Sequence, residues 1–450
     1  MVGKRLGHES IFCTSCLIIL GCFLLCPISA SADMGRSLAI ASSPNPVGSG
    51  ARALGMGGAF IGVADDATAA SWNPGGLIQL ETPEASVVGG YNHRTEDTTY
   101  SAFPEASGPQ RTSSFDLNYL SGVYPFQILK YNAVVSLNYQ HLYDFNKKVQ
   151  FGARDGEPPD IKETMHQMEQ EGGLYAISPA FSFQIAPALS VGVTLNVWED
   201  ALFNNEWKLK RHQTTSGSIL GIPYSSTEDY QERSAFSGIN FNLGIMWDIN
   251  SMFTLGAVFK SPFSGDVKYS NHQTVSTVYP TYPEMNNTKV KRFSEKETLD
   301  MPMSYGLGLA ARLSDALTLA MDVYRTEWGD YVLHTGDGRK LSPITGKPES
   351  ESDVGATTQV RLGGEYLIIG EQMVIPLRAG LFYDPEPADG SPDNFWGISI
   401  GSGIAWKQIV YDIAYQYRFG RNVRAGMVED QSARQDVDQH IVYMSVIYHF

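Results

Sequence analysis

Cysteine is almost missing from this chain of 450 residues. The four that exist, Cys13, Cys16, Cys22 and Cys26, all lie close to the N-terminus. If that segment is removed during export, the chain that remains contains no cysteine. Disulfide bonds, thiolate nucleophiles and cysteine metal sites are then excluded from the exported protein.

Long apolar runs are just as scarce. Only residues 11–28 approach the roughly 18 to 20 apolar residues that a membrane-spanning helix requires. Basic residues precede this run, and the small residues at 30–32 follow it. Because this is the layout of a secretory signal peptide, we assign residues 1–32 to a signal peptide that is cleaved before Asp33.

Basic side chains are outnumbered by acidic ones, 33 Lys and Arg against 48 Asp and Glu, and the formal net charge is −15. Binding to nucleic acid needs the opposite balance, so no nucleic acid is expected among the partners. The nine histidines have no metal-ligand spacing, and no Gly-x-Ser-x-Gly motif is present. We therefore predict a protein that is not an enzyme and that has no cofactor and no metal site.

Short alternating runs of apolar residues are abundant, and the C-terminus shows the pattern most clearly. Phe450, Tyr448, Val446, Met444 and Val442 occupy every second position back from the last residue. Because the side chains of a strand alternate between its two faces, this pattern places one face in lipid and the other toward a polar interior. An exported chain with such a last strand is typical of a β-barrel in the bacterial outer membrane.

Fourteen segments carry the strand pattern, and the connections between them alternate between short turns and long loops. Fourteen strands with this alternation of connections predict an all-β fold, a 14-stranded antiparallel transmembrane β-barrel. Both ends of the chain would lie in the periplasm, and the long loops would be extracellular. A soluble β-sandwich or propeller would explain the spacing but not the long apolar faces. The predicted strands are residues 84–92, 113–125, 131–143, 173–184, 188–199, 235–248, 252–260, 302–313, 315–325, 358–369, 373–384, 395–406, 408–419 and 440–450.

Two of the long loops mix apolar side chains with charge. Met165 and Met168 lie in the loop predicted at 144–172, while Phe203 and Trp207 lie in the loop at 200–234. An apolar patch there would be the place where a hydrophobic molecule first binds. The alternative is that these loops only cover the barrel.

Proline and tryptophan mark special positions along the predicted strands. Pro179 and Pro376 lack the N–H that a strand ladder needs, so each marks a sideways gap in the wall or an ordinary bulge. Four tryptophans near strand ends are expected to form interfacial girdles or to point into the lumen. They are Trp198, Trp247, Trp396 and Trp406.

Residues 33–83 do not have the strand pattern and are rich in Gly, Ala and Ser. A barrel of fourteen strands is too wide for its own side chains to fill, so it either holds another part of the chain or forms an open pore. We therefore predict that residues 33–83 form an N-terminal hatch, or plug, inside the lumen. Residues 84–450 would form the transmembrane β-barrel.

Three early motifs and four later segments carry a family resemblance. The motifs are the glycine-rich opening at residues 48–60, Ala64-Asp65-Asp66-Ala67 and Trp72-Asn73-Pro74-Gly75-Gly76-Leu77. They resemble the N-terminal hatch of the FadL/TodX type (OmpP1 family) of outer-membrane transport protein. Similar to that family's later paired strands are residues 301–308, 317–328, 360–366 and 377–385.

The resemblance implies a plugged barrel that takes up hydrophobic molecules, such as long-chain fatty acids or aromatic hydrocarbons, and releases them sideways into the bilayer. Independently of the resemblance, Asn73 could pin the plug by hydrogen bonds to side chains that face the lumen; the alternative is that Asn73-Pro74 only turns the chain into the first strand. A similar glycine-rich opening also occurs in barrels that act as scaffolds or shuttles of secretion systems, so that function stays open, as does a general diffusion porin. The resemblance implies a role in the hatch and its gating for Asp65, Asp66, Trp72, Asn73, Pro74 and Gly75, with Gly75 standing where the family has Ala.

Arginines that alternation places on the lumen face could meet the carboxylate of a fatty acid, because a guanidinium donates paired hydrogen bonds. The alternative is that they only form salt bridges within the barrel wall. The candidates are Arg361, Arg378 and Arg418. Other expected partners are outer-membrane lipids, lipopolysaccharide and the machinery that assembles barrels.

Overall fold

The computed structural model describes residues 48–100, 107–156, 158, 160–425 and 433–450. The predicted signal peptide, its cleavage site and the first part of the predicted plug lie outside these described residues. Within them, no helix combines the length and the hydropathy needed to cross a membrane.

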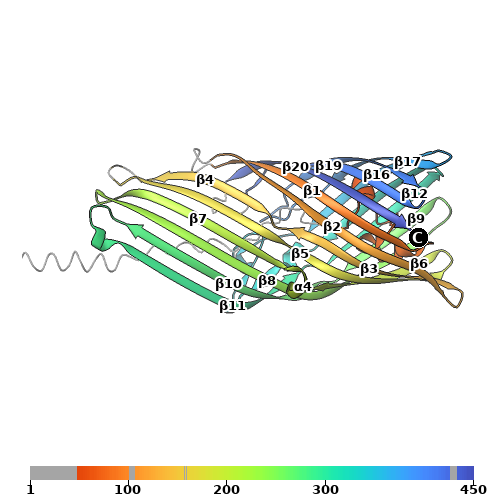
Figure 1. Cartoon of the computed structure of the whole chain (residues 1–450), viewed down its shortest axis with the longest axis horizontal. Helices are drawn as coiled ribbons and strands as arrows, with labels where there is room; N and C mark the ends of the chain where they lie inside the picture. The colour runs from red at the N-terminus through yellow and green to blue at the C-terminus, as the bar shows by residue number, and fades with distance from the viewer. Residues whose placement is uncertain (1–47, 101–106, 157, 159, 426–432) are drawn as a thin grey trace, which may run out of the picture.

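Fourteen strands of the described residues form a closed antiparallel barrel (Figure 1). Each strand pairs with the next around the wall, and the first and last strands close the circle by pairing Glu84 with His449. The wall strands are, in order, β1 (Glu84–Thr99), β2 (Gly108–Ile128), β3 (Tyr131–Asp144), β5 (Lys162–Ala186), β6 (Leu189–Trp198), β8 (Ile222–Asp248), β9 (Phe253–Lys260), β12 (Ser304–Ser314), β13 (Leu317–Thr326), β16 (Thr357–Ile369), β17 (Met373–Tyr383), β18 (Phe395–Trp406), β19 (Ile409–Arg424) and β20 (Arg434–His449).

The lipid-facing stripe predicted from alternation is present on the wall. Along β8, Ile239, Leu243 and Trp247 are exposed, whereas Asn240 and Met246 between them are buried toward the inside. The apolar side chains therefore point outward, the reverse of a soluble protein, as a barrel surrounded by hydrocarbon requires. All fourteen predicted strands are confirmed by this pairing, most of them to within two residues at the end nearer the short turns.

Three of the long loops expected between the predicted strands, at 144–172, 200–234 and 261–301, are wrong, because most of these residues form β-strands. The wall strands β5 and β8 continue far beyond the barrel, and β8 alone is 27 residues long. Four further strands pair with these continuations in the order β4-β5-β7-β8-β10-β11, and we call this six-stranded sheet the extension (Figure 1, left). The added strands are β4 (Lys147–Asp155), β7 (Glu206–Ile219), β10 (Phe263–Val278) and β11 (Asn287–Met301).

Side-chain chemistry explains why the extension was missed. On its outer face β8 presents Asp229, Gln231 and Arg233, in place of the apolar stripe of the wall. On its inner face Tyr230 and Tyr269 bond to each other and to Glu232. Since both faces carry polar side chains that can be in contact with water, these strands lack the alternation of apolar residues that identifies a strand in the sequence.

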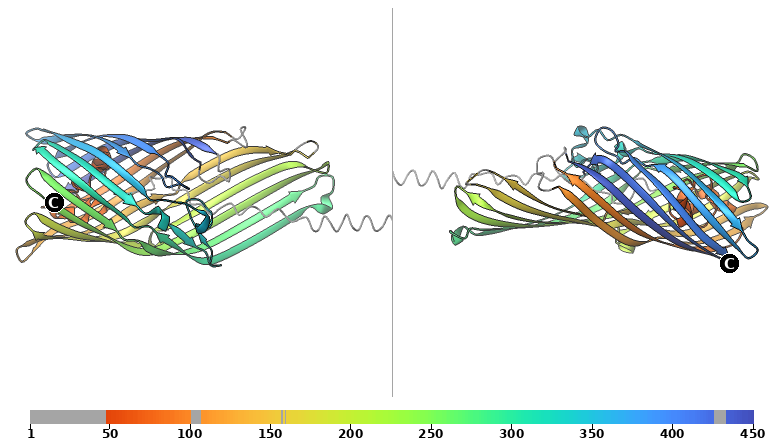
Figure 2. Two further views of the ribbon diagram at one scale, coloured as in Figure 1. Left: turned by 180° about the vertical axis from the view of Figure 1, so that it is seen from behind. Right: turned by 90° about the horizontal axis from the view of Figure 1, so that it is seen from above.

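The lumen holds two other parts of the chain. Residues 48–83, here called the luminal segment, lie inside the wall at the end where the C-terminus lies (Figure 2). Residues 327–356, here called the cover, connect β13 to β16 and pack among aromatic side chains nearer the extension. Their short elements, with two from other connections, are α2 (Ala51–Gly55), α3 (Ala69–Trp72), η1 (Pro74–Gln79), η4 (Trp328–Asp330), β14 (Val332–His334), β15 (Lys340–Leu341), η5 (Glu349–Glu351), α4 (Asp200–Phe203) and η3 (Pro283–Met285).

The four tryptophans near strand ends divide between the two predicted places. Trp247, Trp396 and Trp406 are exposed on the outer surface, as expected of interfacial girdles. Trp198 is buried and donates its indole N–H to Asn240 inside the barrel, 2.9 Å away. It therefore belongs to the lumen.

One strand allows the membrane boundary to be tested. We expect Leu243→Arg to destabilise the barrel by about 2–4 kcal/mol, because it places a charge on the lipid-facing part of β8. Gln231→Arg on the outer face of the same strand should leave stability unchanged, because that part of β8 meets water. The readout is the temperature at which the folded barrel loses its faster migration in SDS gels, and equal losses would contradict the boundary.

Candidate functional site

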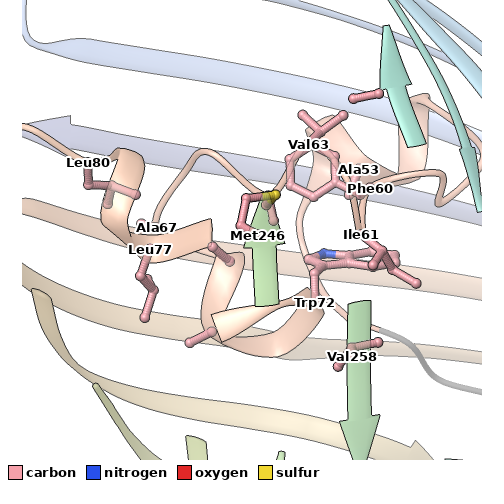
Figure 3. Close-up of a cluster of buried hydrophobic side chains, with 14 of the residues drawn as sticks. Ala53, Phe60, Ile61, Val63, Ala67, Trp72, Leu77, Leu80, Met246 and Val258 are labelled. Atoms are coloured by element: carbon pink, nitrogen blue, oxygen red, sulfur yellow. The ribbon is translucent and has the colours of Figure 1, made fainter. Parts of the chain in front are cut away.

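The luminal segment has an apolar core of its own (Figure 3). Phe60 and Trp72 meet edge to face, with ring centroids 5.8 Å apart, and Leu77 is fully buried beside them. Met246 of β8 and Val258 of β9 extend this core to the wall. The segment is thus a folded unit packed on the barrel, which accounts for its burial in spite of short helices that would not be stable alone.

Glycines let the backbone of the segment touch the backbone of the wall. Three pairs of glycines lie directly opposite each other on neighbouring strands, and a Cβ on any of them would overlap the luminal segment. A side chain added at Gly57 of the segment would lie 3.2 Å from Gly380 of the wall. The wall pairs, with the residues they approach, are Gly192 and Gly244 (Asn73, Pro74), Gly256 and Gly308 (Ile61, Gly62), and Gly363 and Gly380 (Met56, Gly57).

Polar side chains of the wall satisfy the backbone of the segment. Asp322 accepts hydrogen bonds from the N–H groups of Phe60 and Ile61, at 2.7 and 2.9 Å. Thr194 donates to the carbonyl of Ala70 at 2.9 Å, and similar bonds reach other segment carbonyls from Ser190 and Ser399. Buried backbone groups need such partners, so these side chains make the lumen a suitable place for irregular chain.

The predicted hatch residues Asn73, Pro74 and Gly75 lie where the segment crosses β6 and β8. Asn73 is fully buried, and its amide donates to the carbonyls of Ile61 and Ile245 at 3.0 and 2.9 Å. It therefore bonds to the wall backbone and not to the side chains that the sequence suggested. Its Oδ1 accepts a hydrogen bond from the N–H of Gly75, so Asn73 caps the N-terminus of η1, which begins at Pro74.

Trp72, Asp65 and Asp66 hold the other side of the segment. Trp72 donates its indole N–H to the carbonyl of Ser49 at 2.6 Å. Asp66 accepts two bonds from Thr68, at 2.8 and 2.6 Å. Burial raises the pKa of Asp66, against the opposing effects of Arg52 and Thr68.

A chain of charges ties Asp65 to the wall. Arg52 of the segment lies 2.6 Å from Asp65 and 2.8 Å from Glu365 of β16. Glu365 is also 2.6 Å from Arg378 of β17, which in turn meets Asp412 of β19 at 2.5 Å. Signs alternate along all five groups, so each charge has an opposite neighbour, and Arg378 is fully engaged within the protein.

A second chain of buried charges includes Arg418. Its guanidinium lies 2.9 Å from Asp384 and 2.8 Å from Glu386, and it stacks over Phe395 at 4.0 Å. The remaining members connect this group to β1 and β4. They are Arg94 (3.5 Å from Glu386), Glu96 (3.0 Å from Arg94) and Lys147 (3.1 Å from Glu96).

The opposite side of the lumen has apolar and aromatic side chains around a small cavity of about 50 Å³. It lies against β3, β6, β8, β9, β12 and β13, with the cover contributing Trp328. Trp328 and Trp198 are both buried, and their indole N–H groups donate hydrogen bonds to Thr357 and Asn240, respectively. Their rings are therefore available for apolar contact, together with Leu142, Phe263 and Met301.

The cavity also has a polar part. Asn196 donates to Asn242 at 3.2 Å and accepts from Ser178 at 2.8 Å, while Ser304 and Tyr324 bond at 2.5 Å. Lys260 lies among them, directly opposite Asn242 on β8 and Ser304 on β12. An aromatic part and a polar part that includes Lys260 are the two kinds of lining that a molecule with an apolar body and a small polar head requires.

Arg361 lies next to this polar part, close enough for an electrostatic interaction with Lys260. It donates to the side-chain oxygen of Gln359 at 2.9 Å and to the carbonyl of Gly58 at 3.4 Å. Its Nε–H is buried and has no hydrogen-bond partner in the described part of the chain. Asp384 and Asp322 are near enough to act on it electrostatically, but of the three predicted arginines Arg361 is the one that forms no ion pair among the described residues.

Both prolines coincide with gaps in the strand ladder. The β5–β6 pairing passes from Ile177 to Ala180 without a paired residue between them, and Pro179 lies in that interval. The β17–β18 pairing is likewise interrupted at Pro376, whose carbonyl accepts a bond from Ser402 at 2.9 Å. The gap at Pro179 is adjacent to Asn196, which lines the cavity.

Comparison with protein families gives one match over nearly the whole chain. Residues 41–450 match the family described as outer membrane protein transport protein (OMPP1/FadL/TodX). No curated protein sequence gives a significant match. The family describes transport proteins and not enzymes.

Solved structures with the same fold are numerous but distant in sequence. A Pseudomonas aeruginosa FadL homologue is 15% identical, with a TM-score of 0.58, over 90% of this chain and 98% of that one. The P. putida toluene transporter TodX is 16% identical, with a TM-score of 0.54, over 90% and 99%. The monoaromatic hydrocarbon channel CymD is 17% identical, with a TM-score of 0.53, over 90% and 98%.

The contact between segment and wall can be tested with one methyl group. Gly363→Ala should displace the luminal segment, because the new Cβ overlaps the carbonyl of Met56 and neither backbone can move freely. We expect a loss of about 1–3 kcal/mol, seen as a lower unfolding temperature, and new cleavage by trypsin after Arg52.

Gly122→Ala is the matched control, since a Cβ there meets nothing within 4 Å. It should leave both readouts unchanged. If Gly363→Ala also leaves Arg52 protected, the segment is not held by this contact.

Proposed function

Since the chain belongs to the OMPP1/FadL/TodX family of outer membrane transport proteins, we propose that it takes up hydrophobic molecules across the outer membrane. The observation that supports this most directly is the cavity beside the cover, whose lining includes Trp198, Phe263, Met301 and Trp328. An apolar chain gains roughly 0.8 kcal/mol for each CH₂ that it buries there.

The preferred cargo is a molecule with a long apolar body and one carboxylate, such as a long-chain fatty acid. Lys260 would hold the carboxylate, and Arg361 would add its Nε–H, which makes no hydrogen bond to any residue that the structure describes. Hydrogen bonds to charged groups are worth about 1.5–3 kcal/mol, enough to select such a head group. Arg378 and Arg418 already have carboxylate neighbours, so in this proposal they hold the wall and the segment together.

The luminal segment would act as the plug, and the hatch residues would keep it in place during transport. Asn73, Pro74 and Gly75 contact the glycines of β6 and β8, while Asp65 and Trp72 hold the other side of the segment. Because so many backbone contacts hold the plug against the wall, the proposed path of the cargo goes around the plug and not through it. Because the charged half of the lumen is also filled, the cargo would leave through the wall beside the cavity.

The gap at Pro179 is the proposed exit. Pro179 is exposed on the lipid-facing side, and Ser178 beside it bonds to Asn196 of the cavity wall. An unpaired interval between β5 and β6 can widen without breaking ladder hydrogen bonds, because proline has none to donate. This would let an apolar molecule pass sideways into the bilayer.

The inner face of the extension would guide the cargo toward the cavity. Met168 and Trp207, two of the residues expected to form an apolar patch, are buried on that face, whereas Met165 is exposed on the outer one. The side chain of Phe203 lies outside the described part of the chain. A general diffusion porin is disfavoured by a lumen occupied over both halves, and a secretion scaffold would not need the cavity.

Uptake by cells that lack their own transporter tests the cargo. Lys260→Met should lower the uptake of a labelled long-chain fatty acid by about tenfold or more, because the carboxylate loses its charged partner. Uptake of toluene, which has no charge, should stay as it is in the parent protein. Lys407→Met, which removes an exposed lysine from a short turn, is the control.

Three other outcomes of that assay are informative. A fall of both cargoes would mean that Lys260 is needed for folding or for a common step, and toluene uptake alone would favour aromatic hydrocarbons. Absence of uptake of either cargo by a barrel that is folded in the membrane would favour the scaffold. A large and steady ion conductance in bilayers would instead identify a porin.

A disulfide across the gap tests the sideways exit. Pro179 and Leu195 stand at opposite positions of the interrupted ladder, and the exported chain has no other cysteine, so Pro179→Cys with Leu195→Cys would close the gap. Uptake should then stop under oxidising conditions and return on reduction. Phe181→Cys with Val193→Cys, two residues further along the same face in a paired region, should have no effect. Continued uptake with the gap closed would favour a path along the barrel axis.

A further inference from the structure

The outer face of β10 and β11 carries three unusual cross-strand pairs. Lys268 lies directly opposite Lys296, Ser270 opposite Ser294, and His272 opposite Arg292. Exposure alternates along β10, with Val267 and Tyr269 buried and Lys268 and Ser270 exposed, so the six side chains share the outer face. We call this set the β10–β11 patch.

Like charges opposite each other on a sheet are unfavourable. Elsewhere on the same face lysines are paired with acids: Lys210 lies 3.0 Å from Glu171, Lys208 is 2.5 Å from Glu206, and Lys148 meets Glu169. No ion pair among the described residues involves Lys268, Lys296 or Arg292. Two acids border the patch on this face: Asp266, two positions from Lys268, and Asp229, whose partner Thr274 lies two positions from His272. The three cations Lys268, Lys296 and Arg292 outnumber them, so the patch keeps a net positive charge.

The patch also has a buried donor or acceptor without a partner. The Nε2 atom of His272 is inaccessible to water and makes no hydrogen bond within the described part of the chain. Lysine, arginine, histidine and serine side chains are the donors that hold phosphate oxygens. Their arrangement on two neighbouring strands leaves a strip of donors along the ribbon.

The position of the strip identifies its ligand. Lys268 is paired with Ala235 of β8, four residues from Ile239, where the lipid-facing stripe begins, and His272 is paired with Gln231, four residues further on. At about 3.3 Å per residue the patch therefore extends from about 13 to about 26 Å along the strand beyond the apolar stripe. We propose that it binds the phosphate groups of lipopolysaccharide in the leaflet around the barrel.

Binding of purified lipopolysaccharide to the full chain in detergent tests this, independently of any cargo. The probes are a rough lipopolysaccharide with a phosphorylated inner core and the same material after its phosphates are removed. Lys268→Gln with Lys296→Gln should weaken binding of the first about thirtyfold, the equivalent of ~2 kcal/mol for two lysines at a membrane surface. The dephosphorylated probe should bind the parent and the variant equally weakly.

Lys208→Gln with Lys210→Gln is the matched control, since it removes the same charge from the same face but from lysines that already have partners. It should change affinity by less than about threefold, and all variants should keep the folded migration in SDS gels. Equal losses in both variants, or tight binding of the dephosphorylated probe, would overturn the proposal. Displacement of the lipid by millimolar inorganic phosphate would also overturn it, because the site would then be one for free phosphate.

Discussion

Direct contact between two backbones is the constraint on which the lumen of this barrel depends. The luminal segment crosses the wall strands at glycine pairs, and there is no room for a single Cβ between them. Such close approach would bury unsatisfied polar groups if the wall offered only hydrocarbon. It does not, because Asn73 reaches the carbonyl of Ile245, and Asp322 receives two N–H groups of the segment. The glycines permit the contact, and these polar side chains make it favourable.

The lumen has two chemically different halves. On the side of β16 to β20 and β1, charges alternate in sign through Arg52, Glu365 and Arg378 and, in a second group, through Arg418 and Arg94. On the side of β3 to β13, aromatic side chains surround the cavity. A closed ionic half cannot admit an apolar molecule without separating buried charges, which is expensive. The cavity and the gap beside Pro179 are thus on the side where hydrophobic transport meets the least resistance.

Some of this structure could be predicted from the sequence and some could not, for identifiable reasons. Alternation such as that of Ile239 to Trp247 predicts a wall strand because lipid imposes a strict period of two. The extension has water on both sides, so Asp229 or Gln231 carries no such signal, and its strands were predicted as loops. Lys260 and Arg52 carry no signal in the sequence, because their contacts depend on which strands and segments meet in the folded lumen. The ion pairs of Arg378 and Arg418 could not be predicted for the same reason, since their carboxylate partners are distant in sequence.

The glycine pairs also limit how this protein can be divided into exchangeable parts. A luminal segment taken from a relative with about 15% identity would bring its own side chains to Gly192, Gly256 and Gly363, where the wall leaves no space. A chimera of this barrel therefore has to carry both the wall glycines and the segment residues that contact them.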